Sequence, residues 1–307
     1  MTRARLNLLL ALAVAVLGGI AFWEAWRPEP APPTLGGPSE DEVQAIRIEN
    51  RRGSLRLERA GEHWVIAGTP PLPAAKGRVE RLLSLARARI ERDYPADRAA
   101  PEALGLKPPA ATVVWEPAGF RVRIGGTDPV EGLRYVELGD RIALVPAYVT
   151  EAALGRPEDF VSRRLLPAGA EPVEIRTPQV HLLRSEGRWR VEGDDEVSQD
   201  RIQSLLDEWR HARAIAVERL ADGKTPEGLP EWQVRLADGR TLRFLLEDRE
   251  GQPTRLMRPD LGLAYEISTR LQKALAELPA PPEPADAGEE GDTEAADMPA
   301  ETEVESR

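Results

Sequence analysis

The chain has 307 residues, a formal net charge of −11 and no cysteine. The length suffices for two domains that each bury a core, and the lack of cysteine excludes disulfides, thiolate nucleophiles and cysteine-ligated zinc. Residues 279–307 hold ten acids and one base, so the other 278 residues carry a net charge of only −2. This nearly neutral body disfavours nucleic acid as a partner, because phosphate backbones attract clusters of surplus Lys and Arg.

An apolar run near the N-terminus, residues 8–23, follows Arg3 and Arg5. About 20 residues at roughly 1.5 Å each span a hydrocarbon core of roughly 30 Å. Basic residues ahead of such a run keep the N-terminus cytoplasmic and place the body outside the cytoplasm. The sequence therefore predicts residues 1–26 as a single-pass membrane anchor. The alternative is a cleaved signal peptide, because residues 19–21 fit a small-x-small cleavage pattern.

The rest of the chain divides into a spacer, two similar units and a tail. Residues 27–42 are rich in proline and glycine, which predicts a semi-extended spacer. Residues 43–154 and 173–278 carry the same pattern twice, and residues 155–172 connect them with enough apolar side chains to pack between the units. Residues 279–307 have too little apolar surface to offset the entropy of ordering, so this acidic tail is predicted to be disordered and dispensable for folding.

Each unit opens with alternating apolar and charged residues, which predict a hairpin that ends in a tryptophan-bearing strand. The two tryptophans, Trp64 and Trp189, occupy equivalent positions and are expected to anchor the two cores. An amphipathic helix with a single apolar stripe follows in each unit. The stripe consists of Val79, Leu82, Leu83, Ala86 and Ile90 in the first unit and of Ile202, Leu205, Leu206 and Trp209 in the second.

A Gly-Leu turn, at residues 105–108 and again at residues 228–230, then leads into further alternating strands and a short closing helix. Each unit thus reads β-β-α-β-β-β-β-α, with short turns that favour antiparallel pairing. The expected fold is α+β: two tandem copies of a mostly antiparallel sheet with a covering helix, after one N-terminal transmembrane helix.

The chain carries a set of short motifs: Trp64 in its strand, the helix at residues 79–83, Gly105-Leu106-Lys107-Pro108, Ile124-Gly125, Tyr135-Val136, Leu144-Val145-Pro146 and residues 160–166. Together these motifs resemble the bacterial domain of unknown function DUF4340, over roughly residues 46–267. The resemblance implies a bacterial inner-membrane protein with a periplasmic body that assists gliding-motility-type ABC transporter components. It brings no known catalytic residues.

The sequence contains no recognisable catalytic or metal-binding pattern. The three histidines, His63, His181 and His211, have no metal-ligand spacing. The acidic run at residues 193–196 lacks the ligand spacing of a calcium loop, and residues 125–128 lack the lysine of a phosphate loop and read as a hairpin turn. We therefore predict no metal, no cofactor and no enzymatic activity.

Four residues are candidates for an inter-repeat or partner surface: Arg163, Arg164, Trp115 and Trp232. The two arginines lie in the connector, where they either pair with Glu158 and Asp159 or bind an anion or a partner. The two tryptophans either pack in the cores or present a sheet face to a partner.

Three functions remain open at this level. The first is a non-enzymatic accessory or scaffold protein, with protein partners in an envelope ABC-type transport complex. The second is a ligand-binding protein that uses the groove between the repeats for a peptide or a glycan. A hydrolase is the third and has the least support, because no catalytic constellation is found.

Overall fold

The computed structural model describes residues 15–19, 22–23, 26, 32–194, 196–220 and 226–280. Most of the expected anchor, residues 1–26, and nearly all of the expected tail, residues 279–307, lie outside the described residues. Among the residues described, no helix combines the length and the apolar character needed to cross a membrane.

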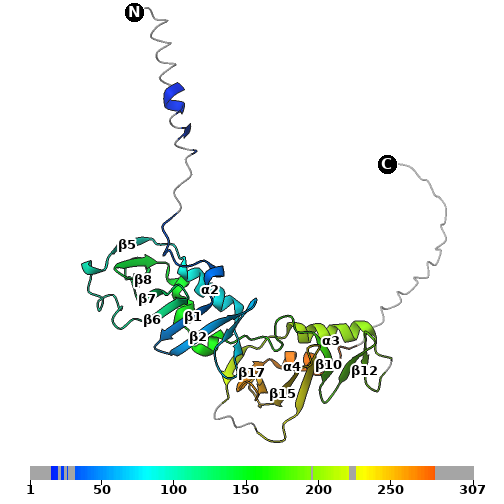
Figure 1. The fold of residues 1–307 in the computed structure, drawn as a ribbon. Helices are drawn as coiled ribbons and strands as arrows, with labels where there is room; N and C mark the ends of the chain where they lie inside the picture. The colour runs from blue at the N-terminus through cyan, green and yellow to red at the C-terminus, as the bar shows by residue number, and fades with distance from the viewer. Residues whose placement is uncertain are drawn as a thin grey trace, which may run out of the picture.

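The first unit is a nine-stranded sheet with one α-helix, α2 (Lys76–Ala86), and short 3-10 helices (Figure 1). The strands are β1 (Ala45–Asn50), β2 (Gly53–Ala60), β3 (His63–Ile66), β4 (Leu72–Pro73), β5 (Arg92–Pro95), β6 (Ala111–Glu116), β7 (Phe120–Thr127), β8 (Arg134–Leu138) and β9 (Arg141–Val145). The 3-10 helices are η1 (Glu40–Glu42), η2 (Ala96–Arg98) and η3 (Ala147–Leu154). The strands follow the order β4-β3-β2-β1-β6-β7-β8-β9-β5, and the neighbours are antiparallel.

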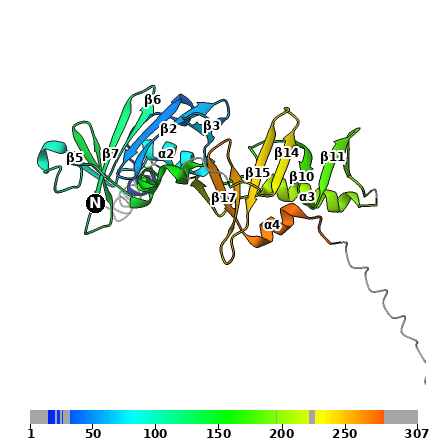
Figure 2. The same ribbon diagram turned by 90° about the horizontal axis from the view of Figure 1, so that it is seen from below.

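The second unit is an eight-stranded antiparallel sheet with the order β12-β11-β10-β14-β15-β16-β17-β13. Its strands are β10 (Pro172–Arg176), β11 (His181–Ser185), β12 (Arg188–Val191), β13 (Ala216–Arg219), β14 (Glu231–Leu236), β15 (Thr241–Glu247), β16 (Thr254–Arg258) and β17 (Leu263–Ile267). Its helices are α3 (Gln199–His211) and α4 (Thr269–Ala276). The two units lie side by side in both views (Figures 1 and 2).

The internal duplication is visible in the sheet topology. Once β4 is set aside, the order β3-β2-β1-β6-β7-β8-β9-β5 matches β12-β11-β10-β14-β15-β16-β17-β13 strand for strand. Trp64 pairs across from Arg59, and Trp189 pairs across from Arg184, so the two tryptophans are structurally equivalent. Trp189 is buried as a core anchor is expected to be, whereas Trp64 is only half-buried and packs at the margin of the first core. The α+β fold with two antiparallel sheets is therefore the predicted one.

The predicted strand count was too low. The order β-β-α-β-β-β-β-α omits β5 and β13, which follow the helix in each unit and pair with the last strand of the sheet. Both are edge strands whose side chains are largely exposed, so they lack the apolar alternation that marks a half-buried strand. The predicted order also counts the third strand of each unit as part of the opening hairpin, and it omits the two-residue strand β4.

The helices cover one face of each sheet. The apolar stripes of α2 and α3 are buried as predicted, although α2 ends at Ala86 and Ile90 lies beyond it. Ser198 is the N-cap residue of α3, and Ser268 is the N-cap of α4, where its hydroxyl accepts a hydrogen bond from the Leu271 amide. Figure 2 shows α3 and α4 together on the same side of the second sheet.

The described part of the expected spacer, residues 32–42, packs on the first unit instead of standing away from it. The Leu35 side chain is buried, its amide donates to Ala88 O, and the Gly37 amide donates to Ala86 O. A Cβ at Gly37 would lie 2.5 Å from Ala86 O, so only glycine allows this close approach. Residues 32–42 are therefore not a free linker, because one buried apolar side chain and a few backbone hydrogen bonds hold them on the first unit.

The connector joins the two sheets through backbone hydrogen bonds. It contains the 3-10 helix η4 (Pro157–Phe160), and its residues 160–166 run past the first unit and then the second. The Ala75 amide donates to Phe160 O at 2.7 Å, and the Ser162 amide donates to Pro73 O at 2.8 Å. A few residues later, the Ala214 amide donates to Arg163 O at 2.8 Å. The connector is therefore fixed to both units.

Candidate functional site

The connector arginines do not form the ion pairs that their sequence neighbours suggested. Within the described residues, Glu158 pairs with Arg219 of β13 at 3.4 Å, and the Asp159 carboxylate accepts the Arg156 amide. Arg164 donates from Nη2 to Arg210 O, at the end of α3, over 2.9 Å. Arg163 is exposed. Arg164 thus binds the connector to the second unit. Arg163 stays exposed to solvent at the seam, the contact between the two units that residues 160–166 form.

Trp115 and Trp232 do not belong to a surface. Their side chains are 0% and 1% exposed, each in the core of its own unit. Trp115 packs against Phe120, and Trp232 packs edge-on against Trp209 with ring centroids 5.9 Å apart. Neither tryptophan can therefore belong to a partner surface, because both side chains lie on the face of the sheet that the helices cover.

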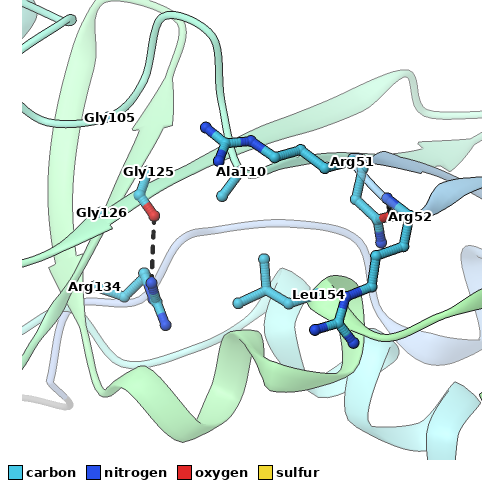
Figure 3. Close-up of a pocket in the computed structure, with 9 residues that line it drawn as sticks. Arg51, Arg52, Gly105, Ala110, Gly125, Gly126, Arg134 and Leu154 are labelled. Atoms are coloured by element: carbon cyan, nitrogen blue, oxygen red, sulfur yellow. Dashed lines mark hydrogen bonds between the residues drawn. The ribbon is translucent and has the colours of Figure 1, made fainter.

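A cavity of about 350 Å³ opens in the first unit where the β1–β2 turn, β7, β8 and η3 meet (Figure 3). Its lining contains three arginines and no acid: Asn50, Arg51, Arg52, Gly105, Ala110, Gly125, Gly126, Arg134 and Leu154. In Figure 3 the side chains of Arg51 and Arg52 come from the turn, Arg134 comes from the opposite side, and Leu154 lies between Arg134 and Arg52. We call this cavity the arginine pocket.

Arg134 is the inner cation of the arginine pocket. Its side chain is 15% exposed, and its partners are distant: Glu151 Oε1 at 3.7 Å and Gly125 O at 3.5 Å. The Nε–H of Arg134 is buried and has no hydrogen-bond partner in the described structure. Burying a guanidinium that has only weak partners costs free energy. Such a group therefore binds an anion strongly when one enters the cavity.

The pocket wall is built from closely packed backbone. A Cβ at Gly125 would lie 2.5 Å from Leu104 O, and a Cβ at Gly105, where φ is +65°, would lie 2.9 Å from the Gly126 amide. The β7–β8 register shifts between Ile124 and Thr127, which removes Gly125 and Gly126 from the ladder. The predicted hairpin turn at residues 125–128 is thus a strand bulge, and the turn itself begins at Asp128.

The turn that carries Arg51 and Arg52 is held in place by Asn50. The Asn50 side-chain amide donates to Ala153 O at 2.8 Å and to Gly155 O at 2.9 Å, and its carbonyl accepts the Arg52 amide. The second unit repeats this arrangement, since Thr177 donates from its hydroxyl to Ala276 O at the end of α4. The two arginines therefore project from a fixed turn.

The second unit has no cation at the equivalent positions. The turn between β10 and β11 carries Pro178 and Gln179 in place of the two arginines. In the first unit Arg134 pairs with Val145, shortly before η3. In the second unit Thr254 pairs with Ile267, shortly before α4. Thr254 is therefore the equivalent of Arg134. Its hydroxyl donates to Gln272 Oε1. The arginine pocket is thus a property of the first unit alone, and its arginines are too far apart in the chain to form a sequence motif.

A second polar cluster surrounds His181 on the outer face of the second sheet. Its Nε2 lies 2.8 Å from Glu174 Oε1 and its Nδ1 lies 2.5 Å from Glu192 Oε2. Burial works to raise the pKa of Glu174, but the His181 hydrogen bond and the nearby Arg235 outweigh it and lower that pKa. Both ring nitrogens face carboxylates, and in the described part of the chain no group of His, Asp and Glu residues is arranged to hold a metal ion.

The outer faces of both sheets, opposite the helices, are covered by ion pairs. On the first sheet Glu116 pairs with Arg47 at 3.0 Å and with Arg56 at 2.8 Å, and the hydrogen bond from Arg56 lowers the pKa of Glu116. On the second sheet Glu174 pairs with Arg235 at 2.6 Å. These faces are polar surfaces with fixed charge positions, not continuations of the cores.

The family model of the domain of unknown function DUF4340 matches residues 64–247. The chain belongs to this family. Two segments that carry the DUF4340 resemblance, residues 105–108 and Ile124-Gly125, meet in the wall of the arginine pocket. Neither the curated proteins nor the solved structures include a match to the chain.

Proposed function

We propose that this DUF4340 protein is a membrane-anchored, extracytoplasmic scaffold that positions protein partners of an envelope ABC-type transport complex without catalysing a reaction. Residues 1–26 serve as the anchor in this proposal, on the strength of the apolar run and the arginines that precede it. The transport complex enters through the family resemblance, which links such proteins to gliding-motility-type ABC transporter components.

The observation that carries the proposal is the fixed connection between the two sheets. Phe160, Val161, Leu165 and Leu166 of the connector are all buried, and backbone hydrogen bonds tie the same segment to both units. A scaffold needs two binding surfaces at a constant separation and orientation, and a packed connector supplies this. The ion-paired outer faces of the sheets are the surfaces that we assign to partners.

A ligand-binding groove between the repeats has less support than a scaffold. The apolar connector side chains are buried where such a groove would run. Two cavities among the described residues each lie within one unit, the arginine pocket in the first unit and another beside Trp189 in the second.

Photocrosslinking in native membranes tests the scaffold proposal. A benzophenone amino acid is placed at Arg121 and at Arg243, which are exposed on the outer faces of the two sheets, and at Ser84 and Ser204, which are exposed on α2 and α3. We expect discrete adducts with membrane transport proteins from the sheet positions and much weaker ones from the helix positions. Sheet positions that give no discrete protein adduct would contradict the proposal.

A further inference from the structure

We infer that the arginine pocket is a binding site for a phosphate-type oxyanion, with Arg134 as the inner ligand and Arg51 and Arg52 at the rim. The cavity, the three guanidinium groups and the unsatisfied donor of Arg134 lie together in one unit. The site is independent of the scaffold proposal, since it involves neither the seam nor the outer sheet faces.

The state of Arg134 argues for an anion rather than for a purely structural ion pair. Its carboxylate partner, Glu151, is 62% exposed and 3.7 Å away, so this pair is weak and screened by solvent. The buried Nε–H has no acceptor. An oxyanion in the cavity supplies acceptors for the guanidinium fork and offsets the cost of desolvating it.

Net charge and shape favour a phosphate over a neutral ligand. Three guanidinium groups face a cavity with no acid in its lining, which favours a dianion. The glycine wall brings backbone close to the cavity, and the Asn50 hydrogen bonds fix the turn that carries the rim arginines. The backbone of the site is therefore preorganised, and the entropy cost of binding falls on the exposed side chains of Arg51 and Arg52.

Phosphate groups reach such a site from two sources, a soluble phosphate ester or a phospholipid headgroup. Both present the same oxyanion to the arginines, so the shared chemistry defines the site. The cavity lining also contains Leu154 and Ala110, which leaves apolar surface for the part of the ligand next to the phosphate.

The test uses the full-length protein in a neutral detergent and follows thermal unfolding during titration with sodium orthophosphate, against sodium chloride at equal ionic strength. A ligand that binds only the folded state raises the melting temperature. We expect such a rise for the wild type, and a loss of affinity of about tenfold or more in Arg51→Ala/Arg52→Ala. These two residues are exposed, so the double variant is expected to fold.

Two further variants separate the site from general charge effects. Arg81→Ala/Arg270→Ala removes two exposed charges from α2 and α4 and is expected to bind like the wild type. Arg134→Thr introduces the residue that the second unit has at this position and is expected to abolish the response to phosphate. Equal responses in the rim double variant and the helix double variant, or no response in the wild type, would overturn the inference.

The ligand source is decided by two more titrations. Glycerol 3-phosphate represents a soluble ester, and dihexanoyl phosphatidylglycerol below its micelle concentration represents a lipid headgroup. Tighter binding of either one than of orthophosphate, lost in Arg51→Ala/Arg52→Ala, identifies the source. Equal and weak binding of all three, unaffected by the rim variant, would contradict a built site.

Discussion

Replacement of Trp209 by alanine is expected to destabilise the protein by about 3–5 kcal/mol, the usual cost of deleting a large aromatic side chain from a core. Trp209 is 0% exposed, and its ring lies 5.9 Å from the rings of both Trp232 and Phe244. Its indole Nε1–H donates to Leu275 O at 3.0 Å, which ties α3 to α4. The substitution removes an aromatic cluster and leaves a buried carbonyl without its donor.

Urea unfolding followed by far-ultraviolet circular dichroism measures this loss. Trp64→Ala is the matched comparison, because Trp64 is only half-buried at the margin of the core and the Arg59 guanidinium lies over its ring, 5.1 Å from the ring centroid. We expect it to cost roughly 1–2 kcal/mol. A loss for Trp209→Ala as small as the one expected for Trp64→Ala would show that the second core does not depend on the Trp209 cluster.

Replacement of Phe160 by alanine is the second change with a large expected effect. Phe160 is 1% exposed in the connector; its own carbonyl accepts the Ala75 amide, and the Ser162 amide donates to Pro73 O two residues later. A buried phenylalanine of this kind contributes about 3–5 kcal/mol. Because it lies at the seam, its loss is expected to separate the unfolding of the two units as well as to lower the melting temperature.

Scanning calorimetry checks both parts of this expectation. The wild type is expected to unfold in one cooperative transition, and Phe160→Ala in two. Tyr148→Ala, at an aromatic residue that is 73% exposed on η3, is expected to leave the curve unchanged. A single transition at an unaltered temperature in Phe160→Ala would mean that the connector does not couple the units.

The sequence predicted the repeated parts of the fold well, because there the buried face imposes a strict pattern. The stripes on α2 and α3 are buried, and the equivalence of Trp64 and Trp189 follows from their register. The repeat also helps the prediction, because an element that is ambiguous in one copy can be assigned from the equivalent residues of the other copy.

The repeat also shows how the same sheet accommodates different cores. The α2 residue equivalent to Trp209 is Ala86, so the first unit has space where the second has an indole ring. Gly37 lies against both Ala86 and Phe120, and Leu35 is buried in the same core. The N-terminal segment thus packs beside Ala86, where the small side chain leaves room for it.

The parts that escaped prediction depend on contacts between distant segments. The edge strands β5 and β13 are recognisable by their partners, not by their side chains. The arginine pocket combines the turn after β1, a bulge in β7 and the first residue of β8, which are far apart in the chain. In the sequence, Arg134 resembles any other charged strand residue, and only the structure shows that its Nε–H is buried without a partner.

The scaffold proposal requires the two sheets to form one rigid body, and a distance measurement between them tests this most directly. The chain has no cysteine, so Ala118→Cys and Ala237→Cys, both in exposed turns of the two sheets, allow specific spin labelling of the full-length protein. Pulsed electron paramagnetic resonance is expected to give one narrow distance distribution in detergent and in native-like membranes. A broad or two-peaked distribution would mean that the units move relative to one another, and the scaffold account would fail.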